Sequence, residues 1–212
     1  MILIMPRTQN RRVHTALPFA LHDLLPDALA TTAELMTLVQ GARLFEQDGV
    51  PNRMFYVSNG EVTLERCSAD GDRVVLQRVR HGFLAEARLV SARYHCDAVV
   101  TGSGTAISLP VDLLLTELQS QADFAIRWIA MLSAEIRKQR SRCERLSLKS
   151  VEARLLHLID TEGNNGRLRL SSSLKSLAAD LGISHEALYR ELARLERDGR
   201  LARLDGEIRR MR

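Results

Sequence analysis

Residues 184–190, in the C-terminal part of the chain, bring together side chains that can hydrogen-bond to flat polar surfaces. Arg190 carries a planar guanidinium that donates two parallel hydrogen bonds, a geometry that matches the O6 and N7 atoms of guanine. Glu186 carries a carboxylate that accepts a hydrogen bond from the N4 amino group of cytosine. This pair of residues suits contact with base edges in a DNA groove.

Both residues also have a structural interpretation. Glu186 in a first helical turn complements the helix dipole, and Arg190 lies at the i,i+4 spacing of an ion pair with it. Neighbouring side chains extend the candidate surface, and Arg194 is expected on the same outward side. The predicted DNA-binding residues are Lys175, Ser184, His185, Glu186, Ala187, Tyr189, Arg190 and Arg209.

Two short helices joined by a tight turn are predicted to position these side chains. Gly182 is expected to end the first helix, and Ser184 is expected to cap the second. Apolar residues recur at helical spacing, at Leu174, Leu177, Ala178, Leu181, Leu188, Leu192 and Leu195. The pattern indicates a helix-turn-helix, whose second helix would lie in the major groove of DNA.

A second motif follows at residues 201–209, where two short strands flank the turn residues Asp205-Gly206. This segment is predicted to form a β-hairpin wing. An ordinary helical hairpin with a charged outer face is the alternative for the two helices alone. A helix-turn-helix with a wing is more specific for DNA binding than either element by itself.

Composition sets broad limits. A chain of 212 residues with 45% hydrophobic and 26% charged residues is typical of a soluble globular protein with one large or two small domains. The N-terminal apolar run is too short for a signal sequence and no stretch suits a membrane span, so we expect a cytoplasmic protein without a membrane partner. The net charge is +4, but residues 151–212 hold twelve basic and ten acidic residues. The placement of charges therefore matters more than their total.

The N-terminal half changes its pattern near Gly41. Residues 17–39 carry apolar positions at helical spacing, interrupted by Pro26, and predict one or two short helices. Short β-rich runs follow at residues 42–45, 54–57, 62–64, 74–76, 98–101 and 105–109. Turns are predicted at Asp48-Gly49, Asn59-Gly60 and Asp70-Gly71. The spacing predicts a jelly roll with one short helix inserted at residues 82–90.

A helical stretch beginning at Pro110 and a longer helix from about Ala122 to Leu146 are predicted next. The longer helix carries a stripe with the spacing of a coiled-coil seam: Ile129, Leu132, Ile136, Gln139, Cys143 and Leu146. So narrow a stripe on a basic helix favours pairing with a second copy of the chain. Packing of the helix on its own roll is the alternative.

Residues 146–150 are expected to form a hinge, with Ser150 as the N-cap of a helix over residues 151–160. The predicted fold class is α+β, with three parts. These are a jelly-roll sensor domain with N-terminal helices at residues 1–120, a dimerisation helix at 121–147 and a winged helix-turn-helix at 148–212.

In this order of elements the chain resembles the Crp/Fnr family of bacterial transcription regulators along nearly its whole length. Residues 183–192, Ile-Ser-His-Glu-Ala-Leu-Tyr-Arg-Glu-Leu, are similar to the family's Ser-Arg-Glu-Thr-Val-x-Arg recognition helix. Residues 146–155 are similar to the family's hinge and following helix. The resemblance implies a homodimer that binds double-stranded DNA at a pseudo-palindromic operator. It also implies RNA polymerase as a partner.

Carried over by position, Glu186 and Arg190 match the family's base-contacting Glu and second Arg. Ser184 matches the Ser that begins the helix, where it can hold a phosphate. His185 replaces the first Arg of the motif and leaves the corresponding base pair open. Ala187 replaces a Thr and can still meet a thymine methyl group.

The effector side departs from the cyclic-AMP-binding members of the family. Their phosphate cassette resembles Gly-Glu-Leu followed by Arg-Ser, whereas here alanines flank Glu86 and His95-Cys96 replaces the Arg-Ser pair. A neutral imidazole is a poor substitute for a guanidinium on a phosphate. We therefore predict a small effector other than cyclic AMP. The expected pocket includes Glu86, Arg88, His95 and Cys96.

A metal, haem or redox site at His95 and Cys96 is a further hypothesis, because both are soft to borderline ligands. Adjacent strand residues point to opposite faces, however, and a buried Cys is commonly a small hydrophobe, so a packed remnant of the cassette is favoured. The three cysteines, Cys67, Cys96 and Cys143, are too widely spaced for a disulfide framework or zinc knuckle. None precedes Cys67, so the N-terminal cluster of iron–sulfur members is absent, and the cofactor stays open.

Two other functions compete. A cupin-like enzyme is disfavoured because no two histidines have the His-x-His spacing, and no nucleophile elbow, P-loop or Rossmann glycine pattern occurs. A dimer that binds DNA without an effector differs from the leading hypothesis only in the occupancy of the roll. Under the leading hypothesis, an occupant changes how the long helices pair and the hinge re-aims the DNA-binding domains.

Overall fold

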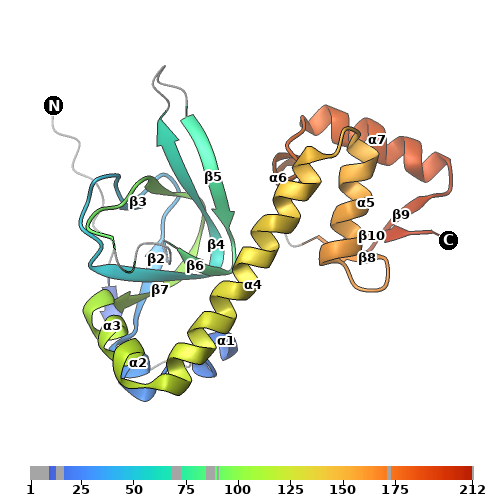
Figure 1. The fold of residues 1–212 in the computed structure, drawn as a ribbon. Helices are drawn as coiled ribbons and strands as arrows, with labels where there is room; N and C mark the ends of the chain where they lie inside the picture. Colours follow the sequence, from blue (N-terminus) through green and yellow to red (C-terminus); the bar gives the residue numbers. More distant parts are fainter. Residues whose placement is uncertain are drawn as a thin grey trace, which may run out of the picture. The chain divides into compact units, whose positions relative to one another are not determined.

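The computed structural model describes residues 10–12, 17–67, 73–84, 89, 91–170 and 173–211 (Figure 1). The chain divides into two compact units, Met1–Ile129 and Ala130–Arg212, and the boundary falls within the helix over Ala122–Ser147. The α+β class is confirmed, because helices accompany an antiparallel sheet in each unit. The three-part division at residues 120 and 147 stays a prediction.

The N-terminal unit is built on an antiparallel sheet, which has seven strands among the described residues. They are β1 (Asn10–Arg12), β2 (Glu34–Leu38), β3 (Arg43–Phe45), β4 (Arg53–Cys67), β5 (Arg73–Val79), β6 (Gly82–Leu84) and β7 (Asp97–Pro110). The order is β1-β2-β7-β4-β5, with β3 paired to β7 and β6 paired to β4. β4 and β7 pair from Arg53 to Glu65, so these two long strands form the centre of the sheet.

The turn predicted at Asn59-Gly60 is wrong, because both residues lie inside the continuous strand β4. The register between β4 and β7 shifts here, and Gly60 adopts φ = 94°. A Cβ atom at Gly60 would lie 2.6 Å from the carbonyl oxygen of Gly102, so the close approach of the two backbones requires glycine. The runs predicted at residues 98–101 and 105–109 are likewise one strand, β7.

The segment at residues 17–39 is helical only in its first part, as α1 (Phe19–His22) and α2 (Asp27–Thr32). The one or two short helices predicted within residues 17–39 are therefore confirmed as α1 and α2, but they end at Thr32. Residues 34–38 form β2, in which Met36 and Leu38 are buried on one side, and the strand pairs with β7. Alternate residues of β2 face the core, so the pairing of the strand overrides the helical spacing of the short apolar run.

The helix predicted at residues 82–90 is also corrected at its start. Gly82–Leu84 is strand β6, which pairs with residues 55–57 of β4. Residues 85–88 and 90, which include Glu86 and Arg88, lie outside the described residues, as does the predicted Asp70-Gly71 turn.

Helices complete the N-terminal unit. α3 (Val111–Ser120) follows Pro110, as predicted, and α4 (Ala122–Ser147) follows it. The start of α4 packs on the sheet, because the ring of Trp128 lies edge-on to that of Phe83 with centroids 4.9 Å apart. The core of the N-terminal unit is apolar, with residues such as Leu38, Val57, Val62, Leu84, Ala98 and Val100 buried together.

The C-terminal unit continues with α5 (Val151–Glu162), β8 (Arg167–Arg169), α6 (Leu174–Asp180), α7 (His185–Arg197), β9 (Leu201–Leu204) and β10 (Glu207–Arg210). Ser150 caps α5 as predicted, since its side chain accepts a hydrogen bond from the Ala153 N–H at 3.0 Å. Asp205 and Gly206 adopt φ of 50° and 75° and join β9 to β10, so the predicted hairpin is confirmed. β10 pairs with β8 on its other side.

Candidate nucleic-acid interface

The inner side of helix α7 packs against the rest of the C-terminal unit. Leu188, Leu192 and Leu195 are fully buried in the apolar cluster of this unit. The hydroxyl of Ser184 accepts a hydrogen bond from the Ala187 N–H at 3.1 Å, which confirms the predicted N-cap. Gly182 adopts φ = 64° after α6, in the left-handed conformation expected of a helix-ending glycine. The opposite side of α7 therefore faces outward.

The outward side carries His185, Glu186, Tyr189 and Arg190. The rings of His185 and Tyr189 lie edge to face with centroids 4.4 Å apart. The pKa of Glu186 is lowered by hydrogen bonds from its own backbone N–H and from the Ser184 hydroxyl, and the charges of His185 and Arg190 add to this effect. Arg190 is exposed, and its guanidinium has no ion pair within the described part of the chain.

Arg194, one helical turn further on, is held differently. Its Nη2 lies 2.6 Å from a carboxylate oxygen of Glu152 and 2.7 Å from one of Glu191, and its Nη1 contacts Asp198. The hydrogen bonds to Glu191 and Glu152 raise the pKa of Arg194 above its ordinary value. The expectation that Arg194 would be available on the outward side is therefore wrong, because it links α7 to α5.

Arginines of the β9–β10 hairpin are also paired with carboxylates. Arg203 on β9 donates two hydrogen bonds of 2.7 Å to Glu196 on α7. Arg210 lies 3.0 Å from Asp160. Arg209, a predicted DNA-binding residue, lies 3.1 Å from Glu207 on the same strand. The pairs of Arg203 and Arg210 join the hairpin to α7 and α5, so these two arginines have a structural role.

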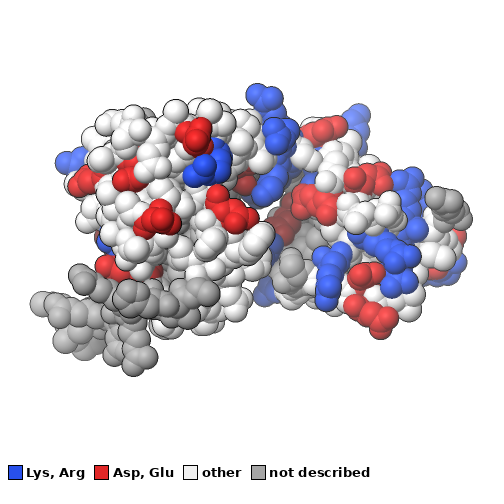
Figure 2. Space-filling view, turned by 90° about the horizontal axis from the view of Figure 1, so that it is seen from below, with Lys and Arg blue, Asp and Glu red and all other residues white. Residues whose placement is uncertain are grey.

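The remaining predicted residues are dispersed over two helices. Lys175 is exposed in the first turn of α6, and Ala187 is half-buried on α7. On the face seen in Figure 2, acidic and basic side chains are mixed over the C-terminal unit, without one uniform basic area. On this face, the positions of individual basic residues therefore matter more than a broad positive field.

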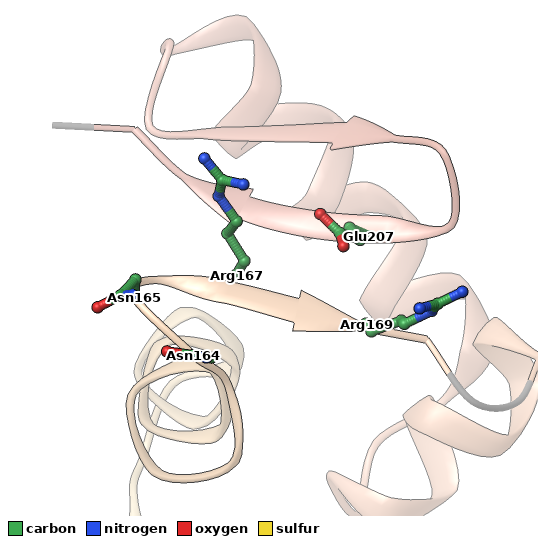
Figure 3. A pocket seen from close by; sticks show the side chains of 5 residues that line it. All are labelled: Asn164, Asn165, Arg167, Arg169 and Glu207. Atoms are coloured by element: carbon green, nitrogen blue, oxygen red, sulfur yellow. The ribbon is translucent and has the colours of Figure 1, made fainter.

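A pocket that was not predicted from the sequence lies beside strand β8 (Figure 3). It has a volume of about 420 Å³ and is lined by Asn164, Asn165, Arg167, Arg169 and Glu207. Arg167 and Arg169 are exposed on the opposite face of β8 from the buried Leu168. The alternation Arg-Leu-Arg is the signal that would have identified this pair, because residues two apart on a strand share a face.

Of the predicted effector pocket, the structure describes only His95 and Cys96. Both lie in a bend before β7, so the premise that a strand would separate their side chains does not apply. Cys96 is buried among the apolar residues of the roll, with its sulfur 4.0 Å from Nδ1 of His95. Within the described ranges, no three His, Cys, Asp or Glu residues are grouped so that they could hold a metal ion.

Phe45 and Tyr94 belong to the same buried apolar cluster as Cys96. The rings of Phe45 and Tyr94 are stacked with centroids 3.9 Å apart, and the Tyr94 hydroxyl donates a hydrogen bond to the Arg53 carbonyl. Burial raises the pKa of Tyr94 to about 12. The neighbourhood of Cys96 is thus well packed and largely apolar.

The predicted seam on α4 has an uneven exposure. Ile129 and Ile136 are 61% and 53% exposed, which is high for such apolar side chains. Cys143 is exposed, Leu132 and Gln139 are half-buried, and Leu146 contacts the turn near Gly182. The middle of α4 therefore presents an apolar stripe that the described part of the chain leaves uncovered.

Comparison with known proteins identifies one matching domain family and several structures of similar fold. Residues 35–121 match the cyclic nucleotide-binding domain family. The structure is similar to FixK2 from Bradyrhizobium japonicum, at 18% identity over 85% of this chain and 93% of that chain, with a TM-score of 0.64. It is also similar to the c-di-GMP responsive global regulator CLP from Xanthomonas campestris, at 19% identity over 85% and 95% of the two chains, with a TM-score of 0.54.

A transcriptional regulator of the CRP family from Thermus thermophilus is similar at 16% identity over 83% of this chain and 91% of that chain, with a TM-score of 0.55. No curated protein matches the sequence. The match at residues 35–121 lies within the N-terminal unit, and the chain as a whole shares its fold with FixK2 and with the CRP-family regulator from Thermus thermophilus. The predicted resemblance to the Crp/Fnr family is confirmed at this level. Among the described residues, no helix is long and apolar enough to cross a membrane.

Proposed function

We propose that this chain is a sequence-specific DNA-binding transcription regulator of the Crp/Fnr type. The observation that carries the proposal is the outward side of α7, where the exposed Glu186 and Arg190 project from a helix whose inner side is fully buried. Helices α6 and α7 and the hairpin β9–β10 have the order of a winged helix-turn-helix. In that motif the second helix enters the major groove of DNA.

The roles follow from the chemistry of the side chains. Arg190 contacts guanine through O6 and N7, and Glu186 accepts a hydrogen bond from cytosine. Ser184 at the start of α7 and Lys175 on α6 contact phosphates, which set the register of the helix on the duplex. The base-contacting surface is completed by His185, Ala187 and Tyr189. Arg209 belongs to the wing, where Glu207 partly neutralises it.

The active form is a homodimer on a pseudo-palindromic operator. The exposed Ile129 and Ile136 on α4 support this step, because a helix with such a stripe gains stability by pairing with a second copy. The predicted seam also includes Leu132, Gln139, Cys143 and Leu146. Two-fold symmetry then places the two recognition helices about one turn of DNA apart.

We further propose that the N-terminal unit binds a small effector other than cyclic AMP. His95 stands where the cyclic-AMP-binding members of the family have an arginine, and the neighbouring Cys96 is buried. Neither residue supplies a permanent positive charge for a phosphate, which supports the proposal. The pocket is proposed to include Glu86, Arg88 and His95. Occupancy would change how the α4 helices pair and would re-aim the DNA-binding parts.

A second candidate is a dimer that binds DNA without an effector. The stacked pair of Phe45 and Tyr94 beside Cys96 favours it, because tight packing leaves less space for a ligand at this point. In both versions we propose RNA polymerase as a partner and the bacterial cytoplasm as the location.

Selection of bound DNA from a random pool, with and without a cell extract fraction, tests these proposals together. The expected result is one enriched motif with two inverted half-sites centred about 10 base pairs apart. If no motif is enriched either with or without the extract, the proposed sequence-specific DNA binding is rejected. Native mass spectrometry of the purified protein, combined with metal analysis, separates the effector-controlled regulator from the effector-independent one.

A further inference from the structure

A single arginine side chain ties the end of α4 to the turn before α7. Arg154 lies in the first turns of α5, where its Nε donates a hydrogen bond to the Leu148 carbonyl at 2.8 Å and its Nη2 donates to the Leu146 carbonyl at 3.1 Å. Its Nη1 donates to the carbonyls of Leu181 at 3.0 Å and Gly182 at 3.3 Å. One guanidinium thus bridges backbone oxygens from two segments that are distant in sequence.

The positions of these carbonyls explain why a cation lies between them. Leu146 is in the last turn of α4, and Leu181 follows the last turn of α6, so their carbonyls belong to the helix ends that lack partners within the helix. A positive charge is favourable at both C-terminal ends. The guanidinium carries five donors on three nitrogens of a rigid fork, whereas an ammonium carries three donors on one nitrogen, so lysine cannot reach all the carbonyls that Arg154 contacts.

A second contact at the same place seats the turn on α4. A Cβ atom at Gly182 would lie 2.9 Å from Cδ2 of Leu146, so the absence of a side chain at residue 182 lets Leu146 pack against the turn. Arg145, whose side chain is 3% exposed, also binds Glu162 and lies 3.4 Å from the Thr161 hydroxyl. The predicted hinge, residues 146–150, is therefore held by Arg154 at the carbonyls of Leu146 and Leu148.

We propose that Arg154 is the positioning residue that couples the end of α4 to the recognition helix α7. It fixes the α6–α7 turn, and with it Ser184, at the start of α7. Movements of the end of α4 are then passed on to α7 and are not absorbed at residues 147–150. The consequence for DNA binding rests on the proposed function, whereas the bridge between the two segments does not.

Hydrogen exchange of the full-length protein tests the bridge without DNA. In Arg154→Met, amides of residues 179–187 should exchange about tenfold faster or more, because charged hydrogen bonds to both segments are lost. Amides of the buried α5 residues 155–159 should keep their exchange rates. Lys149→Met is the matched control, since Lys149 is exposed beside the same segment and its loss removes one charge but no bridge.

Two outcomes of the exchange experiment would overturn the proposal. One is an unchanged exchange rate at residues 179–187, and the other is an equal acceleration throughout the C-terminal unit, which would indicate only a stabilising role. If circular dichroism shows that Arg154→Met does not fold, the exchange experiment is repeated with Arg154→Lys. Its ammonium keeps the charge but reaches fewer carbonyls, so exchange at the turn should still rise with the fold intact, and an unchanged rate would reject the bridge.

Binding to a selected operator gives the functional readout. Arg154→Met should lower affinity for that operator about tenfold or more, while affinity for random DNA falls no further than in Lys149→Met. An equal loss on both DNAs would contradict a positioning role. Should the wild-type protein show no sequence preference, the proposed function fails, and the exchange experiment still decides on Arg154.

Discussion

The rings of His185 and Tyr189 pack edge to face, with centroids 4.4 Å apart and planes inclined by 66°. The two residues are four apart on α7, so they share its outward side, and the contact limits the directions in which the imidazole can point. His185→Arg should shift the preferred base pair at one operator position towards guanine, by about 1–3 kcal/mol. Binding to a panel of operators with single base changes measures this, and an unchanged preference would place His185 away from the bases.

Arg190 and Arg197 lie on the same helix, and neither has an ion pair within the described ranges. Arg190→Ala should cost about 1–3 kcal/mol of discrimination at one base pair and leave binding to random DNA largely intact. Arg197→Ala, near the C-terminal end of α7, removes the same charge and serves as the control. An equal loss of affinity for specific and random DNA in Arg190→Ala would show that Arg190 contacts the backbone.

The ion pair between Glu196 and Arg203 joins α7 to the wing. The Arg203 hydrogen bonds hold the pKa of Glu196 below its ordinary value of 4.5. Glu196→Gln should lower the free energy of unfolding by about 0.5–1 kcal/mol at pH 7. Because the folded-state pKa is depressed, this contribution is present above pH 4.5 and is lost as the pH falls through the folded value. Urea unfolding at several pH values should show the two proteins converging towards low pH, whereas a constant difference would point to another cause.

Leu192 is fully buried between α7 and the rest of the C-terminal unit. Leu192→Ala should lower the free energy of unfolding of this unit by about 2–5 kcal/mol, because it removes buried methyl groups and leaves a cavity. Urea unfolding measures the loss. Leu204→Ala is the control, since Leu204 is 51% exposed and its truncation should cost far less.

Ile136 tests the dimer seam, because its side chain is 53% exposed in the single chain. Ile136→Glu should produce a folded monomer, since a charge at a seam position opposes pairing but costs the isolated chain little. Size-exclusion chromatography with light scattering measures the mass. Lys138→Glu alters an exposed position next to it and should leave the dimer intact. A monomeric wild-type protein would reject the seam altogether.

Local sequence signals predicted the C-terminal unit well. The Ser184 cap, the Gly182 stop and the leucine spacing of α7 depend on residues within one or two helical turns, so the sequence alone is sufficient for them. The Asp205-Gly206 hairpin is equally local. The outward position of Glu186 and Arg190 followed directly from this spacing.

The N-terminal sheet was harder to predict, because its strands are defined by pairing across the chain. Asn59-Gly60 has the composition of a hairpin turn, yet the pairing of β4 with β7 makes it part of a strand with a shifted register. Residues 34–38 have helical spacing, but β7 binds them as a strand. Register between distant segments is not encoded in short patterns.

The sequence by itself determined which side of α7 faces outward, because burial of one leucine stripe leaves only one arrangement for the polar residues. Only the tertiary structure decided which arginines are held by carboxylates or carbonyls of the fold. Glu152, 42 residues from Arg194, occupies that side chain, and the carbonyls that bind Arg154 lie up to 28 residues away. A guanidinium pairs with whichever oxygen the fold brings near it, so its role depends on contacts that no local pattern contains.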